Sequence, residues 1–123
     1  MNFLNKEHEE RFNELIKRGK GIYLSDIERI VSMYIMSGNE DLYSKSKELY
    51  NFSKGEFIFD LEEDERGNFK VQWKRPLSSS EKKLMLLSFD MFSGNNNVGI
   101  DELFSVLDRN NKELALRAIA MRY

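Results

Sequence analysis

The sequence of 123 residues contains no cysteine, one histidine and one proline. A chain without cysteine has no disulfide, no thiolate nucleophile and no cysteine-bound metal, and it fits a reducing compartment such as the cytoplasm. With one histidine and no cysteine, no pair of a catalytic nucleophile and its general base can be assembled. No glycine-rich phosphate-binding loop is present either. We therefore expect a cytoplasmic protein that is not an enzyme and uses no cofactor.

Long apolar runs are also absent. No stretch approaches the roughly 18 apolar residues of a membrane span, so we expect no membrane insertion. The opening letters MNFLNKEHEERF lack the basic region and apolar run of a signal peptide. Apolar residues make up 41% of the chain and charged residues 33%, as in a globular protein, and the net charge of −2 is spread evenly. This even charge weakens any function that needs a phosphate-binding surface.

Most of the sequence is typical of helices in one domain over residues 1–123. Apolar spacing, N-caps and glycine stops predict helices at about 6–18, 26–37, 40–52, 79–92, 100–107 and 111–121. Capping boxes are predicted at Ser25–Glu28 and at Ser78–Glu81. Pro76 prevents the fourth helix from beginning earlier.

Residues 56–74 show the only clear two-residue period, which predicts one antiparallel β-hairpin between two helical halves. The fold class is therefore mainly α (α+β), with five or six helices. The register that satisfies both faces places Leu61 opposite Phe69, with Gly67 in the turn. The other predicted pairs are Phe59–Val71, Phe57–Trp73, Asp60–Lys70 and Glu56–Lys74.

An isolated hairpin is marginally stable in water, so we expect the helices to cover its aromatic face. The predicted core draws on both helical halves and on the hairpin: Phe12, Leu15, Ile16, Ile30, Val31, Tyr34, Leu49, Phe57, Phe59, Val71, Trp73, Leu84, Leu87, Phe104, Leu107, Leu114 and Ile119.

The opposite face of the hairpin, with its free edges, is the predicted contact surface for a protein partner or a second copy of the chain. Its residues are Glu56, Ile58, Asp60, Lys70, Gln72 and Lys74. The leading hypothesis is therefore a non-enzymatic protein–protein interaction module.

Three other features suggest ion sites, and for each the plain interpretation is favoured. His8 has no ligand three or four residues away on its helix, so we expect a partly buried polar helix residue. The Asn95–Asn97 loop resembles an EF-hand, but Val98 and Phe104 stand where that loop needs glycine and a bidentate glutamate. The carboxylates of residues 62–65 are typical of a solvated turn, although they remain candidate ion ligands.

Two alternative functions remain. A nucleic-acid-binding accessory protein is the first, although acidic neighbours make nucleic acid an unlikely partner. The basic residues that would form its surface are Lys70, Lys74, Arg75, Lys82 and Lys83. A carboxylate enzyme with a recruited divalent ion is the less favoured second alternative.

Four strings carry a resemblance to a known group: FLNKEHEERFNEL, SGNEDLY, LYNF and LDRNNKELALRAIAMRY. They resemble a family of short uncharacterised proteins from Firmicutes genomes and their prophages. The resemblance touches both helical halves, and it implies no activity and no role for any residue.

Overall fold

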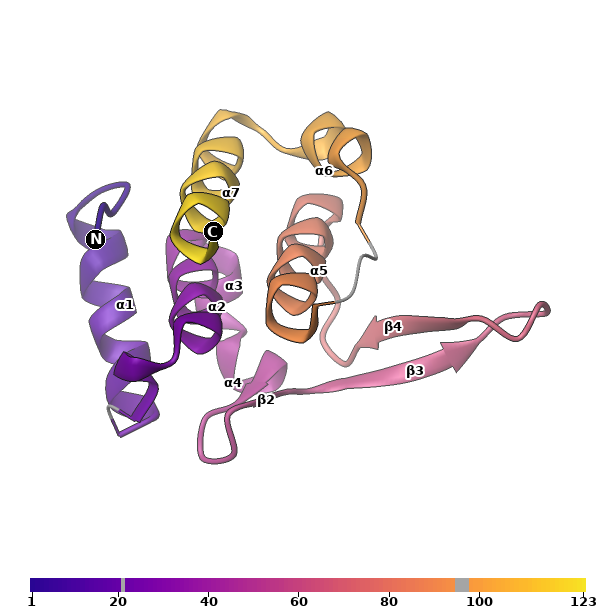
Figure 1. Ribbon diagram of the computed structural model, residues 1–123, viewed down its shortest axis with the longest axis horizontal. Helices are drawn as coiled ribbons and strands as arrows, with labels where there is room; N and C mark the ends of the chain where they lie inside the picture. Colours follow the sequence, from indigo (N-terminus) through magenta and orange to yellow (C-terminus); the bar gives the residue numbers. More distant parts are fainter. Residues whose placement is uncertain (21, 95–97) are drawn as a thin grey trace.

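The computed structural model describes residues 1–20, 22–94 and 98–123. Within these residues the fold is mainly helical, with two small two-stranded antiparallel sheets (Figure 1). This confirms the predicted α+β fold with an antiparallel hairpin between two helical halves. The elements in chain order are α1 (Lys6–Arg18), the 3-10 helix η1 (Ile22–Ser25), α2 (Ile27–Gly38), α3 (Glu40–Ser44), α4 (Ser46–Leu49), β1 (Tyr50–Asn51), β2 (Glu56–Phe57), β3 (Phe59–Glu63), β4 (Phe69–Trp73), α5 (Ser79–Ser93), α6 (Ile100–Val106) and α7 (Arg109–Arg122).

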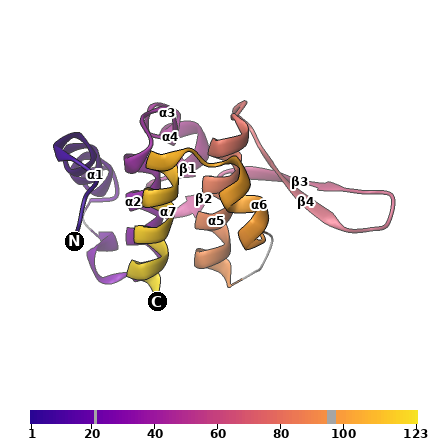
Figure 2. The same cartoon turned by 90° about the horizontal axis from the view of Figure 1, so that it is seen from above.

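Helix α2 lies at the centre of the helical body, with α1, α5 and α7 packed around it (Figures 1 and 2). Every residue from Ile30 to Ser37 is buried. No charged side chain occurs between Arg29 and Gly38, which is the pattern expected of a helix surrounded on all sides. The structure thus buries the whole circumference of α2 over these residues.

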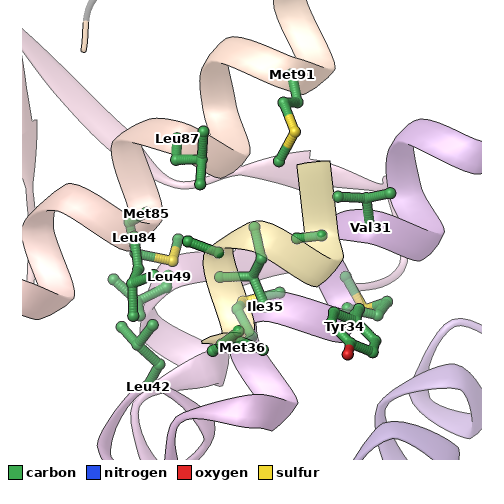
Figure 3. Packing of buried hydrophobic residues seen from close by; sticks show 14 of the residues in the cluster. Val31, Tyr34, Ile35, Met36, Leu42, Leu49, Leu84, Met85, Leu87 and Met91 are labelled. Carbon is green, nitrogen blue, oxygen red and sulfur yellow. The ribbon is translucent and has the colours of Figure 1, made fainter. Parts of the chain in front are cut away.

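The core is built where α2 meets α5. Figure 3 shows Leu84 of α5 beside Leu49 of α4 and facing Ile35 of α2, while Val31 of α2 and Leu87 of α5 lie farther along the same cluster. All five side chains are buried. The helical halves on either side of the hairpin therefore share one core.

Helices α2 and α7 are in close contact at Gly38. A Cβ atom built there would collide with the Leu114 side chain and lie 3.1 Å from the imidazole Nε2 of His8. Leu114 and His8 are fully buried, so neither can move aside easily. Glycine at position 38 is therefore needed for this close contact.

The predicted core is confirmed for the helices, except that Phe104 and Ile119 are only partly buried against it. In the hairpin, Phe57 and Trp73 are likewise partly buried and pack against the core, whereas the prediction is wrong for Phe59 and Val71. The half-buried hairpin residues are Phe57, Phe59, Val71 and Trp73. The aromatic face is thus covered by helices only near its base.

Two predicted local features need correction. The predicted helix 40–52 divides into α3 and α4 and then extends into β1. Hydroxyl groups of Ser44 and Ser46 donate to carbonyl oxygens three residues earlier, a bond that competes with regular helix geometry. The predicted cap at Ser25 is wrong because Ser25 belongs to η1, and Asp26 accepts from the Arg29 amide instead.

The second capping box is confirmed. Ser78 accepts from the Glu81 amide, and the Glu81 carboxylate accepts from the Ser78 amide at 2.7 Å. Lys45 also donates to Glu81 at 3.0 Å, which joins the end of α3 to the beginning of α5. The remaining predicted helices agree with the structure within two residues at each end.

Candidate interaction arm

Strands β3 and β4 form a hairpin that extends away from the helical body in both views (Figures 1 and 2). We call residues 59–73 the arm. The structure pairs Phe59 with Trp73 and Leu61 with Val71. The predicted register is therefore wrong by two residues, but a shift of two keeps every side chain on its predicted face.

The turn explains the shift in register. The Asp64 carboxylate accepts hydrogen bonds from the amides of Arg66 and Asn68, at 2.8 and 2.9 Å. The Asp64 amide donates to the Asn68 carbonyl, and Gly67 has a positive φ of 81°. These bonds close the loop at Asp64 and extend β3 through Glu63, which the predicted register had placed in the turn.

An aromatic cluster anchors the base of the arm. Phe57 is at its centre, with ring centroids 5.1 Å from Tyr50, 5.7 Å from Phe89 and 5.6 Å from Phe92. Phe59 also contacts Phe89, at 5.1 Å. These edge-to-face and stacked pairs fix the direction in which the arm leaves the body.

Sequence analysis missed the contribution of α5 to this anchor. Phe89 and Phe92 are three residues apart, a spacing that places both rings on one side of a helix. Their aromatic character and spacing were the available signal. The sequence did not indicate which strand these rings contact, because that depends on the tertiary packing of α5.

The outer part of the apolar face has no cover. Leu61 is 58% exposed and Phe69 is 65% exposed, and both project from the same face as the half-buried Val71. Each strand of the arm also has one edge without a neighbouring strand among the described residues. Exposed apolar side chains beside a free strand edge are typical of a surface that pairs with another chain.

The opposite face of the arm carries predicted contact residues, but their cross-strand partners differ from the predicted ones. Asp60 lies opposite Gln72, and Lys70 lies opposite Glu62. The Lys74 ammonium is 3.8 Å from the Asp60 carboxylate, so the predicted pair of Asp60 with Lys70 is wrong. These residues are exposed on the arm.

Two of the predicted contact residues lie at the base instead. Glu56 pairs with Asn51 of β1, not with Lys74. Ile58 donates its amide to the Leu49 carbonyl at 2.9 Å and is half-buried. The predicted surface is therefore divided between the arm and the small β1–β2 sheet.

Charge is unevenly distributed along the arm. Residues 62–65 place four carboxylates at the tip, while Lys74 and Arg75 follow the arm at its base. Arg75 is half-exposed and lies 3.8 Å from Glu48, a loose ion pair that water screens strongly. The tip, with four carboxylates and Arg66, is therefore acidic, whereas the base has two exposed cations in loose ion pairs.

The described residues contain no group of three or more acidic or histidine side chains arranged to hold a metal ion. A recess at the turn, lined by Asp64, Glu65, Arg66 and Asn68, is largely open to solvent. The Asn95–Asn97 loop, the other candidate ion site, lies outside the described residues.

His8 is fully buried rather than half-buried. Its Nδ1 accepts the Leu4 amide at 3.1 Å, and its Nε2 is 2.9 Å from the Tyr34 carbonyl oxygen. Both ring nitrogens are therefore used inside the fold. Burial, the largest cause, lowers the pKa of His8 from 6.5 to about 4, with Arg11 and Arg117 also lowering it.

None of the helices in the described parts of the chain is both long and apolar enough to cross a membrane. The chain matches neither a curated protein nor a solved structure. A family model described as a family of unknown function, DUF6075, matches residues 1–123, and the chain therefore belongs to the DUF6075 family.

Proposed function

We propose that this protein is a protein–protein interaction module whose arm makes the contact. The supporting observation is the exposure of Leu61 and Phe69, on a hairpin that the helical body holds out into solvent. Burial of such side chains in an interface contributes about 25 cal/mol for each Å² removed from water. The folded monomer gains little from them.

The base of the arm supports a binding role as well. The ring of Phe57 contacts Trp73 and two phenylalanines of α5, so the arm is attached to the body through rigid side chains. A surface held in one direction loses less conformational freedom on binding than a mobile loop does. The arm therefore presents its apolar face in an arrangement suited to recognition.

Other expectations from the sequence remain proposals. Cytoplasmic location is supported by the absence of cysteine, and an origin in Firmicutes or their prophages by the resemblance of the motifs. The nucleic-acid alternative has less support, because acidic residues are interspersed with the basic ones and the net charge of the chain is −2. A non-enzymatic role remains the expectation.

The test compares which proteins co-purify with the wild type and with variants of the arm. We would replace Leu61 and Phe69 together by threonine, which keeps strand propensity while removing the apolar surface. Leu116→Thr is the matched control, since Leu116 is 54% exposed on α7, away from the arm. Each protein would be purified under mild conditions from cells of its source, and retained proteins would be quantified by mass spectrometry.

We expect the wild type and the Leu116→Thr control to retain the same protein, whether a different chain or a second copy. The double arm variant should lose it. Equal retention by all three proteins would contradict a binding role for the arm.

A further inference from the structure

We propose that the occupant of the arm is a second copy of this chain, paired antiparallel through the outer edge of β4. This proposal rests on the arm being an interaction surface. It adds the identity of the partner, the direction of pairing and the strand that pairs.

The charge distribution favours an antiparallel arrangement. The tip carries the four carboxylates of residues 62–65 together with Arg66, so its charge is negative. Lys74 and Arg75 at the base are exposed and form only loose ion pairs of 3.8 Å with Asp60 and Glu48. Two arms related by a two-fold axis and pointing in opposite directions place each acidic tip beside the basic base of the other copy. Arms that point the same way would place the two acidic tips together, which like-charge repulsion disfavours.

The residues of β4 suit self-pairing. An antiparallel pair of β4 strands centred on Val71 places Phe69 beside Trp73 of the second copy, and this contact occurs twice because of the symmetry. Lys70 then lies beside Gln72 of the second copy, without like-charge contact. Aromatic cross-strand pairs contribute about 0.2–1 kcal/mol each.

The residues of β3 do not suit it. A pair of β3 strands centred on Leu61 would place Asp60 beside Glu62 of the second copy, twice. Like charges directly opposite each other destabilise a strand pair. The outer edge of β4 is therefore the better edge for self-association.

Pairing through β4 also gives Phe69 an environment. Trp73 contacts Phe57 and Phe59, at 6.1 and 5.9 Å between ring centroids. Phe69, 65% exposed in the single chain, would extend this aromatic cluster in the second copy. The most exposed ring of each arm thus completes the anchor of the other.

The absence of cysteine allows a sharp test of the strand and register. In the proposed pair Val71 faces Val71 of the second copy, where opposed Cα atoms lie about 4.5–5.5 Å apart, within the range of a disulfide. Leu61 is separated from its copy by three strand spacings, about 14 Å. Leu61→Cys is therefore the matched control for Val71→Cys.

Under mild oxidation we expect Val71→Cys to form a covalent dimer and Leu61→Cys to remain uncrosslinked. Light scattering on the unmodified chain at about 100 μM should show a dimer, since an interface with micromolar affinity is largely formed there. Crosslinking of Leu61→Cys alone or of both variants equally, or a strictly monomeric wild type, would overturn the proposal.

Charge reversal tests the direction of pairing. One variant carries Glu63→Lys and Glu65→Lys at the tip, and a second carries Lys74→Glu and Arg75→Glu at the base. Each variant alone should dimerise about tenfold more weakly or worse, because like charges then meet at both ends. An equimolar mixture should form a heterodimer, since each tip then meets a base of opposite charge.

Absence of the heterodimer, with both variants folded by circular dichroism, would overturn the antiparallel arrangement. A third outcome is a monomeric wild type that retains a different protein, which the variant with Leu61 and Phe69 replaced no longer retains. This outcome would overturn self-pairing alone. The proposed interaction function of the arm would then stand.

Discussion

Lowering the pH should destabilise the fold through His8, and this loss should begin well above the pH at which carboxylates titrate. The imidazole is fully buried, and its Nδ1 is the acceptor of the Leu4 amide. A proton on Nδ1 would break that bond and place a positive charge near Arg11 and Arg117. The carbonyl of Tyr34 favours the charged ring, but burial outweighs it.

The sign and size follow from the two pKa values. The pKa of His8 is about 4 in the folded chain, and we take the reference value of 6.5 for the unfolded chain. Between these values the unfolded state binds a proton that the folded state excludes, so stability falls as the pH falls from 6.5 to 4 and levels off below. The full loss is about 3 kcal/mol, of which about 2 kcal/mol should appear by pH 5.

The assay is urea unfolding, followed by circular dichroism between pH 7.5 and pH 4. His8→Gln is the control, because its amide can still donate to the Tyr34 carbonyl but does not titrate. The difference in unfolding free energy between wild type and variant should shrink by about 2 kcal/mol from pH 7.5 to pH 5.

His8 is the only histidine, so its ring protons give one NMR titration without assignment by mutagenesis. A measured pKa near 6.5 would refute the burial of this ring. So would a difference between wild type and His8→Gln that stays constant over the same pH range.

Three further substitutions test the packing, each by urea unfolding. Gly38→Ala should cost about 1–3 kcal/mol through overpacking against α7. Gly99→Ala has open space around its Cβ and should cost at most about 1 kcal/mol, the loss expected at the N-cap of α6; a larger loss for Gly99→Ala than for Gly38→Ala would contradict the close contact. Phe89→Ala should cost about 2 kcal/mol by weakening the aromatic anchor, while Phe69→Ala on the exposed arm should be nearly neutral, and the reverse order would argue that the arm is packed against the body. Glu81→Gln should cost about 1–3 kcal/mol. Although burial raises the pKa of Glu81, hydrogen bonds from a backbone amide and a lysine hold it below 4.5, so the wild type loses this stability as the pH falls below 4.5 and the variant should not.

The helices were largely predictable because their signals are local. Asn5 caps α1, Ser78 and Glu81 form the box that begins α5, and Gly94 ends α5 in the left-handed conformation. Each depends on a few neighbouring residues. The division of the predicted helix 40–52, where serine hydroxyls are bonded to the backbone, was not predictable from apolar spacing alone.

The arm shows what alternation can and cannot predict. It identified which side chains share a face, and that part survived the two-residue error in register. It could not show whether a face is covered, because cover depends on where α5 packs. The sequence predicted Val71 in the core and gave no cause to expect Leu61 and Phe69 in solvent.

The contact surface was predicted on the polar face for a similar reason, whereas the surface that we propose is the apolar one. The polar residues Asp60, Gln72 and Lys74 were chosen because the apolar face was expected to be covered. In the structure Asp60 and Lys74 lie beside each other, while the apolar face remains open. Burial of His8 was also missed, because its Leu4 and Tyr34 partners are backbone groups.

The most direct test of the account measures binding and stability together in the Leu61→Thr, Phe69→Thr double variant. Because both side chains are mostly exposed, the free energy of unfolding of the monomer should stay within about 0.5 kcal/mol of the wild type. Its association, with a second copy or a different protein, should be lost. Retained association, or a large loss of monomer stability, would contradict the conclusion that the arm is an exposed binding surface.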